Sequence, residues 1–204
     1  MSGECSLVSV VDDDEAVRAA MDSLFRSVGH LVETFESTED YLAAKHSSLP
    51  CCLVLDVRLP GASGLELQSI LWARGCDRPI VFVTGHGDIP MTVAAMKRGA
   101  IEFLTKPFRD QELIDAVSRG VSLDRERRLR TAGLSDLHQR FARLSARERE
   151  VMSSVTAGRM NKETASLLDL SEVTVKVHRG NVMRKMEARS LAELVRMADR
   201  LSEN

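Results

Sequence analysis

The sequence predicts an α/β fold, a doubly wound parallel sheet of five strands, followed by a second, all-α domain of four helices. Two observations carry this prediction. Over residues 1–120, short apolar runs alternate with helical patterns, which is typical of parallel strands that are buried between helices. Over residues 144–204, helix-capping residues recur at short intervals around helical patterns.

Five apolar runs are predicted as the strands of the sheet, at residues 7–11, 31–35, 53–56, 80–83 and 101–104. Helices are expected at about 17–28, 37–46, 65–71 and 90–99, and from 110 onward. Gly29 and Gly99 mark helix ends, and Pro90 suits a first helical turn. Because strands and helices alternate, the expected strand order is 2-1-3-4-5, as in flavodoxin-like sheets.

Residues 121–143 differ from the sequence on either side. The segment 124–130 is a charged run with little apolar face, and a stripe of apolar residues resumes at Leu134. Between them, Thr131–Gly133 could interrupt a helix. We therefore interpret 121–143 as an interdomain linker that is helical at both ends. It is too short for a coiled coil to be argued.

The remaining segment, 144–204, predicts four helices at about 146–157, 162–168, 172–186 and 191–202. Capping boxes begin at Ser145 and Ser190, and Gly158 closes the first of these helices. Asn161 and Ser171 are suitable N-caps for the two helices between them. The short pair joined by residues 169–170 is a predicted helix-turn-helix, whose second helix normally enters the DNA major groove.

One face of the helix 172–186 is expected to contact DNA. At about 100° per residue, Val175, Val182 and Met186 point in one direction and form the core face. The residues farthest from that face are Val177, Gly180, Asn181 and Arg184, with Lys176 at the flank.

Other polar residues of this region have more than one interpretation. Arg179 is nearer the core face and is expected to reach a phosphate or a neighbouring helix. His178 is expected to be packed and hydrogen-bonded. Arg184 and Lys185 could bind phosphates or simply be solvated, and Lys162 and Thr174 could position the motif on the DNA backbone.

Polar residues follow four of the predicted strands, at the edge where parallel sheets bind their ligands. They are Asp12, Asp13 and Asp14, then Asp56, then Thr84, then Thr105 and Lys106. Crowded carboxylates bind a hard cation such as Mg²⁺, a carboxylate can form an acyl phosphate, and an ammonium attracts phosphoryl oxygens. Each residue taken singly could be a helix cap, but together they predict a phosphoryl-transfer site with Asp56 as the nucleophile.

Composition and charge agree with a DNA-binding second half. The formal net charge of −2 divides into −7 for residues 1–120 and +5 for residues 121–204. No apolar stretch approaches the roughly 18 residues of a membrane span, and residues 1–6 lack the basic start of a signal peptide. The four cysteines show no metal-ligand spacing, so we expect reduced thiols in a cytoplasmic protein.

The motifs resemble those of a known family. Residues 7–120 resemble a CheY-like receiver domain, through VVDDD at 10–14, LVLDVRLPGASG at 53–64, VFVTGHGD at 81–88 and IEFLTKPF at 101–108. Residues 144–201 resemble a LuxR-type helix-turn-helix, through LSAREREVM at 144–152, NKETASLL at 161–168 and SEVTVKVHRGNVMRKM at 171–186. The whole chain resembles a FixJ-type response regulator.

This resemblance implies roles for individual residues. Asp56 matches the phosphoacceptor, Asp13 a direct ligand of Mg²⁺ (or Mn²⁺), Asp12 a ligand acting through water, and the Arg58 carbonyl a further ligand. Thr84 and Lys106 match the switch hydroxyl and the phosphate-binding lysine, Phe103 the aromatic switch, and Lys106–Pro107 a cis peptide bond. In related proteins the positions of Lys176, Val177 and Gly180 contact bases, although Gly180 has no side chain to do so.

The resemblance also implies a function and partners. A sensor histidine kinase would phosphorylate Asp56, and the protein would then dimerise through the face that carries Met91, Val93 and Lys97, bind promoter DNA and act on RNA polymerase. We expect a regulator rather than an enzyme, because a haloacid-dehalogenase-type phosphatase needs a carboxylate where Arg58 stands. A phosphate sink or protein-interaction regulator without a DNA target remains the alternative.

Overall fold

The computed structural model describes residues 5–85 and 89–202. The chain divides into two compact units, Met1–Arg128 and Leu129–Asn204, which are treated separately below. Their boundary falls inside the segment predicted as a linker. No helix among the described residues combines the length and apolarity needed to cross a membrane.

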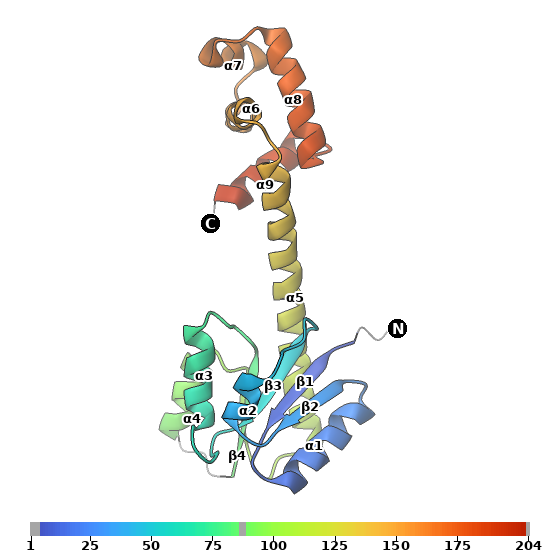
Figure 1. The fold of residues 1–204 in the computed structure, drawn as a ribbon, viewed down its shortest axis with the longest axis vertical. Coiled ribbons are helices and arrows are strands. Elements are labelled where there is room, and N and C mark those ends of the chain that lie inside the picture. Colours follow the sequence, from blue (N-terminus) through green and yellow to red (C-terminus); the bar gives the residue numbers. More distant parts are fainter. Residues whose placement is uncertain (1–4, 86–88, 203–204) are drawn as a thin grey trace. The chain divides into compact units, whose positions relative to one another are not determined.

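The first unit contains the predicted parallel sheet (Figure 1). Its strands are β1 (Leu7–Val11), β2 (Leu31–Phe35), β3 (Cys51–Asp56), β4 (Ile80–Thr84) and β5 (Glu102–Thr105). They pair in the order β2-β1-β3-β4-β5, and every pair is parallel. The expected strand order is therefore confirmed.

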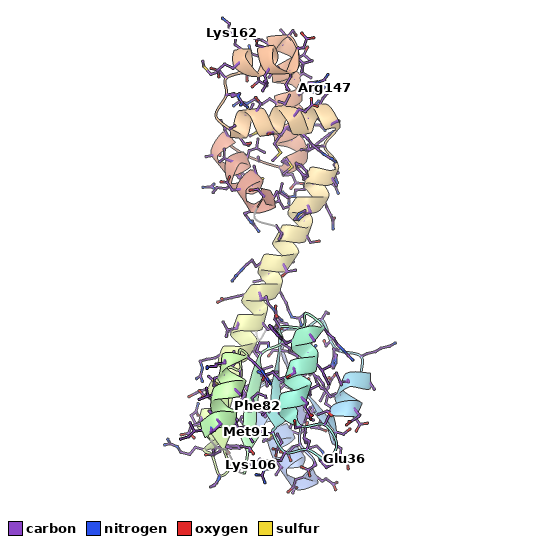
Figure 2. All side chains as sticks on the ribbon, turned by 90° about the vertical axis from the view of Figure 1, so that its left-hand side faces the viewer. Glu36, Phe82, Met91, Lys106, Arg147 and Lys162 are labelled. Carbon is purple, nitrogen blue, oxygen red and sulfur yellow. The ribbon has the colours of Figure 1, made fainter. Side chains whose placement is uncertain are left out.

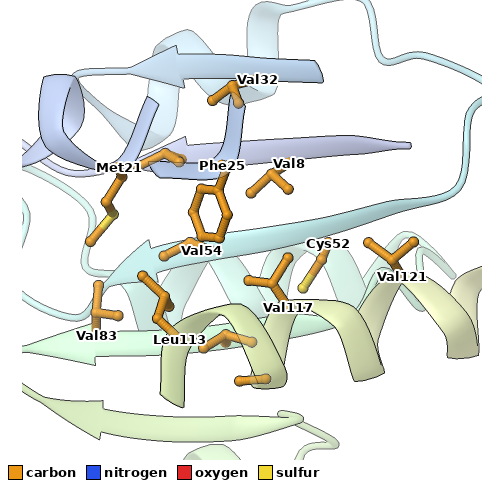
Figure 3. Packing of buried hydrophobic residues seen from close by; sticks show 13 residues of the cluster. Val8, Met21, Phe25, Val32, Cys52, Val54, Val83, Leu113, Val117 and Val121 are labelled. Atoms are coloured by element: carbon orange, nitrogen blue, oxygen red, sulfur yellow. The ribbon is translucent and has the colours of Figure 1, made fainter. Parts of the chain in front are cut away.

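Helices cover both faces of this sheet. They are α1 (Glu15–Ser27), α2 (Thr38–Ala43), α3 (Gly64–Ala73), α4 (Ile89–Lys97) and α5 (Asp110–Ala142). On one face, Met21 and Phe25 of α1 pack with Leu113, Val117 and other residues of α5 against strand valines (Figure 3). On the other face, residues of α2, α3 and α4 form a second apolar cluster with the sheet. The helix α2 ends at Ala43, three residues before the expected end, because Ala44 is already extended.

The fifth helix is longer than the sequence suggested. α5 continues through Thr131–Gly133, so the expected interruption does not occur. Glycine in a helix costs only about 0.5–1 kcal/mol relative to alanine, and Gly133 has no positive φ. Beyond it, Leu137 is buried in the core of the second unit, and Leu134 and Phe141 pack against that core. This packing favours the helical conformation that the local sequence left open.

The second unit contains the four predicted helices after the end of α5 (Figure 1). They are α6 (Ala146–Thr156), α7 (Asn161–Leu168), α8 (Glu172–Met186) and α9 (Leu191–Ser202). The capping box from Ser145 to Glu148 is present. Asn161 was wrongly expected to be an N-cap: it is the first residue of α7, where the backbone N–H of Met160 donates to Glu163 instead.

Candidate phosphoryl-transfer site and candidate DNA interface

Three carboxylates meet at the carboxyl ends of β1 and β3. These strands are hydrogen-bonded neighbours in which Val11 pairs with Leu55, so the next residues, Asp12 and Asp56, lie side by side. Together with Asp13, they place carboxylate oxygens within 4.8 Å of one another. Asp12 and Asp56 are buried, whereas Asp13 is exposed to an approaching ligand.

Lys106 enters this cluster from the end of β5. Its Nζ donates hydrogen bonds to Asp12 Oδ2 at 2.6 Å and to Asp56 Oδ2 at 2.8 Å. The backbone N–H of Lys106 donates to the Thr84 carbonyl at 2.7 Å, which fixes the start of the loop after β5. Figure 2 labels Lys106. The peptide bond from Lys106 to Pro107 is cis, as expected.

Burial and hydrogen bonding shift the pKa values of Asp12 and Lys106. Burial raises the pKa of Asp12, although the hydrogen bond from Lys106 opposes the shift. For Lys106, burial alone would lower the pKa, but the hydrogen bonds to Asp12 and Asp56 outweigh it and raise the pKa. The ammonium is therefore held in its charged form between the two carboxylates.

The chemistry of the cluster fits a divalent cation. Three carboxylates carry three formal negative charges, and Lys106 is the one ammonium hydrogen-bonded to them within the described residues. Hard cations such as Mg²⁺ take oxygen ligands of this kind and keep several waters. Asp56 Oδ1 also accepts a hydrogen bond from the Arg58 N–H at 2.9 Å, which fixes the loop that bears the Arg58 carbonyl.

Asp14 does not share this role. Its side chain is the N-cap of α1 and accepts hydrogen bonds from the N–H groups of Ala16 and Val17. Adjacent aspartates therefore separate into pocket carboxylates and a helix cap, a distinction that depends on where the strand ends and the helix begins.

Sequence inspection missed Gly64, which allows the start of α3 to approach the backbone of Asp56 closely. A Cβ at this position would lie 2.2 Å from the Asp56 carbonyl oxygen, so no other residue fits without a backbone shift. Its N–H also donates to the Val57 carbonyl. A glycine at the start of a helix just after the Pro60–Gly61 turn was the available signal.

Thr84 and Phe103 lie on the neighbouring strands β4 and β5, in which Phe82 pairs with Phe103 and Thr84 with Thr105. Thr84 is the buried last residue of β4. Phe103, on β5, is half-buried, and its ring centroid lies 6.1 Å from that of Phe82. Phe103 therefore packs at the edge of a core cluster, where its side chain borders both protein and solvent.

In the second unit, the predicted orientation of α8 is confirmed. Val175, Val182 and Met186 are fully buried, as expected for the core face. Lys176, Val177, Gly180 and Arg184 are exposed, so the face predicted to contact DNA is free of intradomain packing. Lys162, on α7, is also exposed (Figure 2).

Several flanking residues have structural partners. Arg179 donates to Asn161 Oδ1 on α7 at 3.1 Å, so it reaches the neighbouring helix. Lys185 is bound by Glu148 at 2.6 Å, which assigns it to the contact between α8 and α6. Thr174 shares a hydrogen bond with the hydroxyl of the N-cap Ser171. His178 is packed as expected, but its Nδ1 has no hydrogen-bond partner in the described part of the chain.

The face predicted for dimerisation is partly exposed. Val93 is 44% exposed and Lys97 is also exposed on α4, whereas Met91 packs against the core. Ile89 and Met96, which were not predicted, are 80% and 42% exposed. At about 100° per residue, Ile89, Val93 and Met96 share one side of α4 and form an apolar patch, called the α4 patch below.

Comparison with known proteins identifies both units. Residues 8–118 match the response regulator receiver domain, and residues 142–198 match the bacterial regulatory proteins of the luxR family. These matches correspond to the two motif sets that the sequence displayed.

Relatives and a solved structure match nearly the whole length of this chain. Nodulation protein W of Bradyrhizobium diazoefficiens is 52% identical over 196 residues, covering 96% of this chain and 86% of that protein. Transcriptional regulatory protein FixJ of Azorhizobium caulinodans is 45% identical over 191 residues, covering 94% and 90%. The solved structure of the response regulator StyR superposes with a TM-score of 0.89 at 49% identity, covering 95% of this chain and 98% of that one. The chain therefore belongs to the FixJ-type response regulators, which join a receiver domain to a LuxR-type DNA-binding domain.

Proposed function

We propose that this protein is a phosphorylation-controlled transcription regulator whose phosphoacceptor is Asp56. The observation that carries the proposal is the cluster of Asp12, Asp13, Asp56 and Lys106, in which the buried carboxylates of Asp12 and Asp56 stand at the ends of neighbouring strands and share the Lys106 ammonium. A sensor histidine kinase supplies the phosphoryl group. An Asp56 carboxylate oxygen attacks phosphorus, the bond from phosphorus to the kinase histidine breaks, and an aspartyl phosphate forms.

The surrounding residues bind and orient the phosphoryl group. Asp13, Asp56 and the Arg58 carbonyl would hold Mg²⁺ (or Mn²⁺), with Asp12 acting through water. When bound, the ion neutralises the charge of the pocket and of the incoming group. Lys106 already contacts Asp56 and only has to move to a phosphoryl oxygen of the same residue.

Phosphorylation of Asp56 then changes the position of Thr84 and, through it, the surface of helix α4. The Thr84 hydroxyl follows the phosphoryl group, and Phe103, whose ring borders the core, moves inward. This rearrangement changes the α4 surface and drives homodimerisation there. Two copies of α8 then bind promoter DNA, with the bound dimer acting on RNA polymerase in the cytoplasm.

Within the DNA-binding unit, the proposal assigns different tasks to exposed residues. Lys176 contacts bases together with Val177, while Arg184, Lys162 and Thr174 contact phosphates. Arg179 and the backbone at Gly180 contribute less, because Arg179 is bound to Asn161 and Gly180 has no side chain.

The test compares the wild type with Asp56→Asn. The variant keeps the shape of the side chain but loses the nucleophile, so radiolabelled acetyl phosphate with Mg²⁺ should label the wild type only. The matched control is Asp14→Asn, which retains an N-cap side chain outside the carboxylate cluster and should label normally.

Gel shifts on genomic fragments, with and without the phosphodonor, complete the test. Phosphorylation should strengthen DNA binding by the wild type and by Asp14→Asn, but not by Asp56→Asn. Base-labile label on Asp56→Asn would assign the phosphoacceptor elsewhere. Labelled protein that binds no fragment would favour the phosphate-sink alternative.

A further inference from the structure

Two valines on α8 are exposed without a structural reason. Val173 is 71% exposed and Val177 is 58% exposed, although the same helix buries Val175 and Val182 completely. Branched side chains lower helix propensity, so neither helix formation nor packing explains valine at these two positions.

Their positions place them at the centre of the exposed face. With about 100° per residue, Val173 and Val177 lie within about 20° of the direction opposite Val175 and are separated by one helical turn. Residue 180, beside them, is a glycine with no described atom within 4 Å of where a Cβ would be. Over residues 173–180, the centre of this face therefore offers methyl groups and no hydrogen-bonding side chain.

Charged groups border this apolar centre. Lys176 is exposed at one flank of the valines. Arg184 is exposed on the same face as Val177, two helical turns later. The half of the chain from residue 121 carries a net charge of +5. An apolar surface bordered by cations suits a partner that is apolar locally and surrounded by negative charge, which describes a base edge that bears a methyl group between DNA phosphates.

We propose that Val173 and Val177 contact the C5-methyl groups of thymines in the major groove. The proposal rests on the proposed function, in which α8 enters that groove. Among the four bases, thymine alone presents a methyl group there, whereas the other base edges present polar donors and acceptors. Val173 thereby becomes an additional specificity-determining residue, beside the positions that the family resemblance indicated.

The spacing of the two valines predicts the spacing of the thymines. Four residues of helix rise about 6 Å, and successive base pairs are about 3.4 Å apart. The contacted thymines should therefore lie about two base-pair steps apart, on either strand, in each half-site.

The experiment removes only the methyl groups. The phosphorylated full-length protein first selects duplexes from a pool with a randomised centre. Each thymine of the selected consensus is then replaced by deoxyuridine, which keeps every hydrogen-bonding group. At the two contacted positions, each replacement should weaken binding about fourfold, the effect of withdrawing one methyl-sized group from an apolar contact.

Protein variants connect the effect to the valines. Val173→Ala with Val177→Ala should bind the thymine duplex about as weakly as the wild type binds the uracil duplex, and should no longer distinguish the two. The matched control Val28→Ala removes methyl groups from a 43% exposed valine of the first unit and should retain full sensitivity to uracil.

The outcomes separate this proposal from the one on which it rests. If selection enriches no sequence, DNA binding itself fails and the valine contact falls with it. If a consensus appears but uracil changes no affinity, only the valine contact is overturned. Unchanged uracil sensitivity in the double variant would likewise assign the thymine contact to other residues.

Discussion

Gly64 and Gly180 show at the scale of single residues why two glycines in helices differ. At Gly64 an added Cβ would lie 2.2 Å from the Asp56 carbonyl oxygen, whereas at Gly180 it would meet no described atom within 4 Å. Neither glycine has a positive φ. The difference therefore lies in the neighbours and not in the backbone conformation.

Opposite stability changes are expected from alanine at these positions. Gly64→Ala should lower the free energy of unfolding by about 1–3 kcal/mol through overpacking, and it should reduce acetyl phosphate labelling because Asp56 must shift. Gly180→Ala should raise the free energy of unfolding by about 0.5–1 kcal/mol. Urea unfolding of the full chain measures both changes, and a Gly64→Ala protein of undiminished stability would contradict the close approach.

Lys176 and Arg184 differ in what their loss should do to DNA binding. Lys176→Ala should weaken binding to a selected site more than to random DNA. Arg184→Ala should weaken both about equally and reduce the salt slope by about one. Affinities measured at several salt concentrations provide the check. Equal losses on both DNAs for Lys176→Ala would remove that residue from base recognition.

At the scale of secondary-structure elements, a buried carboxylate attaches the middle of α5 to the sheet. Asp124 is fully buried and accepts hydrogen bonds from the Cys51 N–H at 2.9 Å and from Arg128 Nε at 2.6 Å. It also pairs with Arg127, which in turn donates to the Asp77 carbonyl. Gly120, one turn earlier, allows α5 to approach β3, since a Cβ there would lie 2.6 Å from Cys52 Sγ.

Removing the Asp124 charge should loosen this attachment. Asp124→Asn should lower stability by about 2 kcal/mol, less than a fully buried pair would lose, because Arg127 and Arg128 are 35% and 33% exposed and can be hydrated. Hydrogen exchange should accelerate at residues 120–128. Unchanged exchange there would show that apolar packing alone holds the helix.

The stabilisation of the fold by the Asp124 carboxylate should decrease at low pH. Burial would raise the pKa of Asp124, but the hydrogen bonds from Arg128 and Cys51 outweigh it and hold the pKa below its ordinary value of 3.8. A lowered pKa stabilises the fold fully above the ordinary value and loses that effect as the pH falls through the folded-state pKa. The stability difference between wild type and Asp124→Asn should therefore be constant above about pH 5 and shrink below pH 3.8.

For the whole molecule, the α4 patch predicts how phosphorylation changes assembly. Ile89, Val93 and Met96 are exposed together on α4, and a self-complementary contact between two copies would bury them. Val93→Asp should place a charge in that contact. The phosphorylated variant should remain monomeric while Asp56 still accepts phosphate.

Analytical ultracentrifugation with and without acetyl phosphate measures this outcome. Val28→Asp is the matched control, since Val28 is 43% exposed and Val93 44%; it should dimerise as the wild type does. A phosphorylated Val93→Asp dimer would place the interface on another surface.

The sequence by itself determined the order of the elements and the residues of the candidate phosphoryl-transfer site. Apolar periodicity is a local property, so it predicted the strands and the buried face of α8, and the alternation of strands with helices predicted the strand order. Parallel strands bring their carboxyl ends to one edge of the sheet, so the sequence predicted that Asp12, Asp56 and Lys106 lie together, and hydrogen bonds join them in the structure.

Only the tertiary structure decided features that depend on distant neighbours. The continuity of α5 past Gly133 depends on packing in the second unit, and the requirement for Gly64 depends on the position of the Asp56 carbonyl. Likewise, Lys185 resembles a phosphate contact in sequence but is bound to Glu148 in the fold. Local patterns determine which conformations a segment can adopt, whereas its packing partners determine which one it keeps.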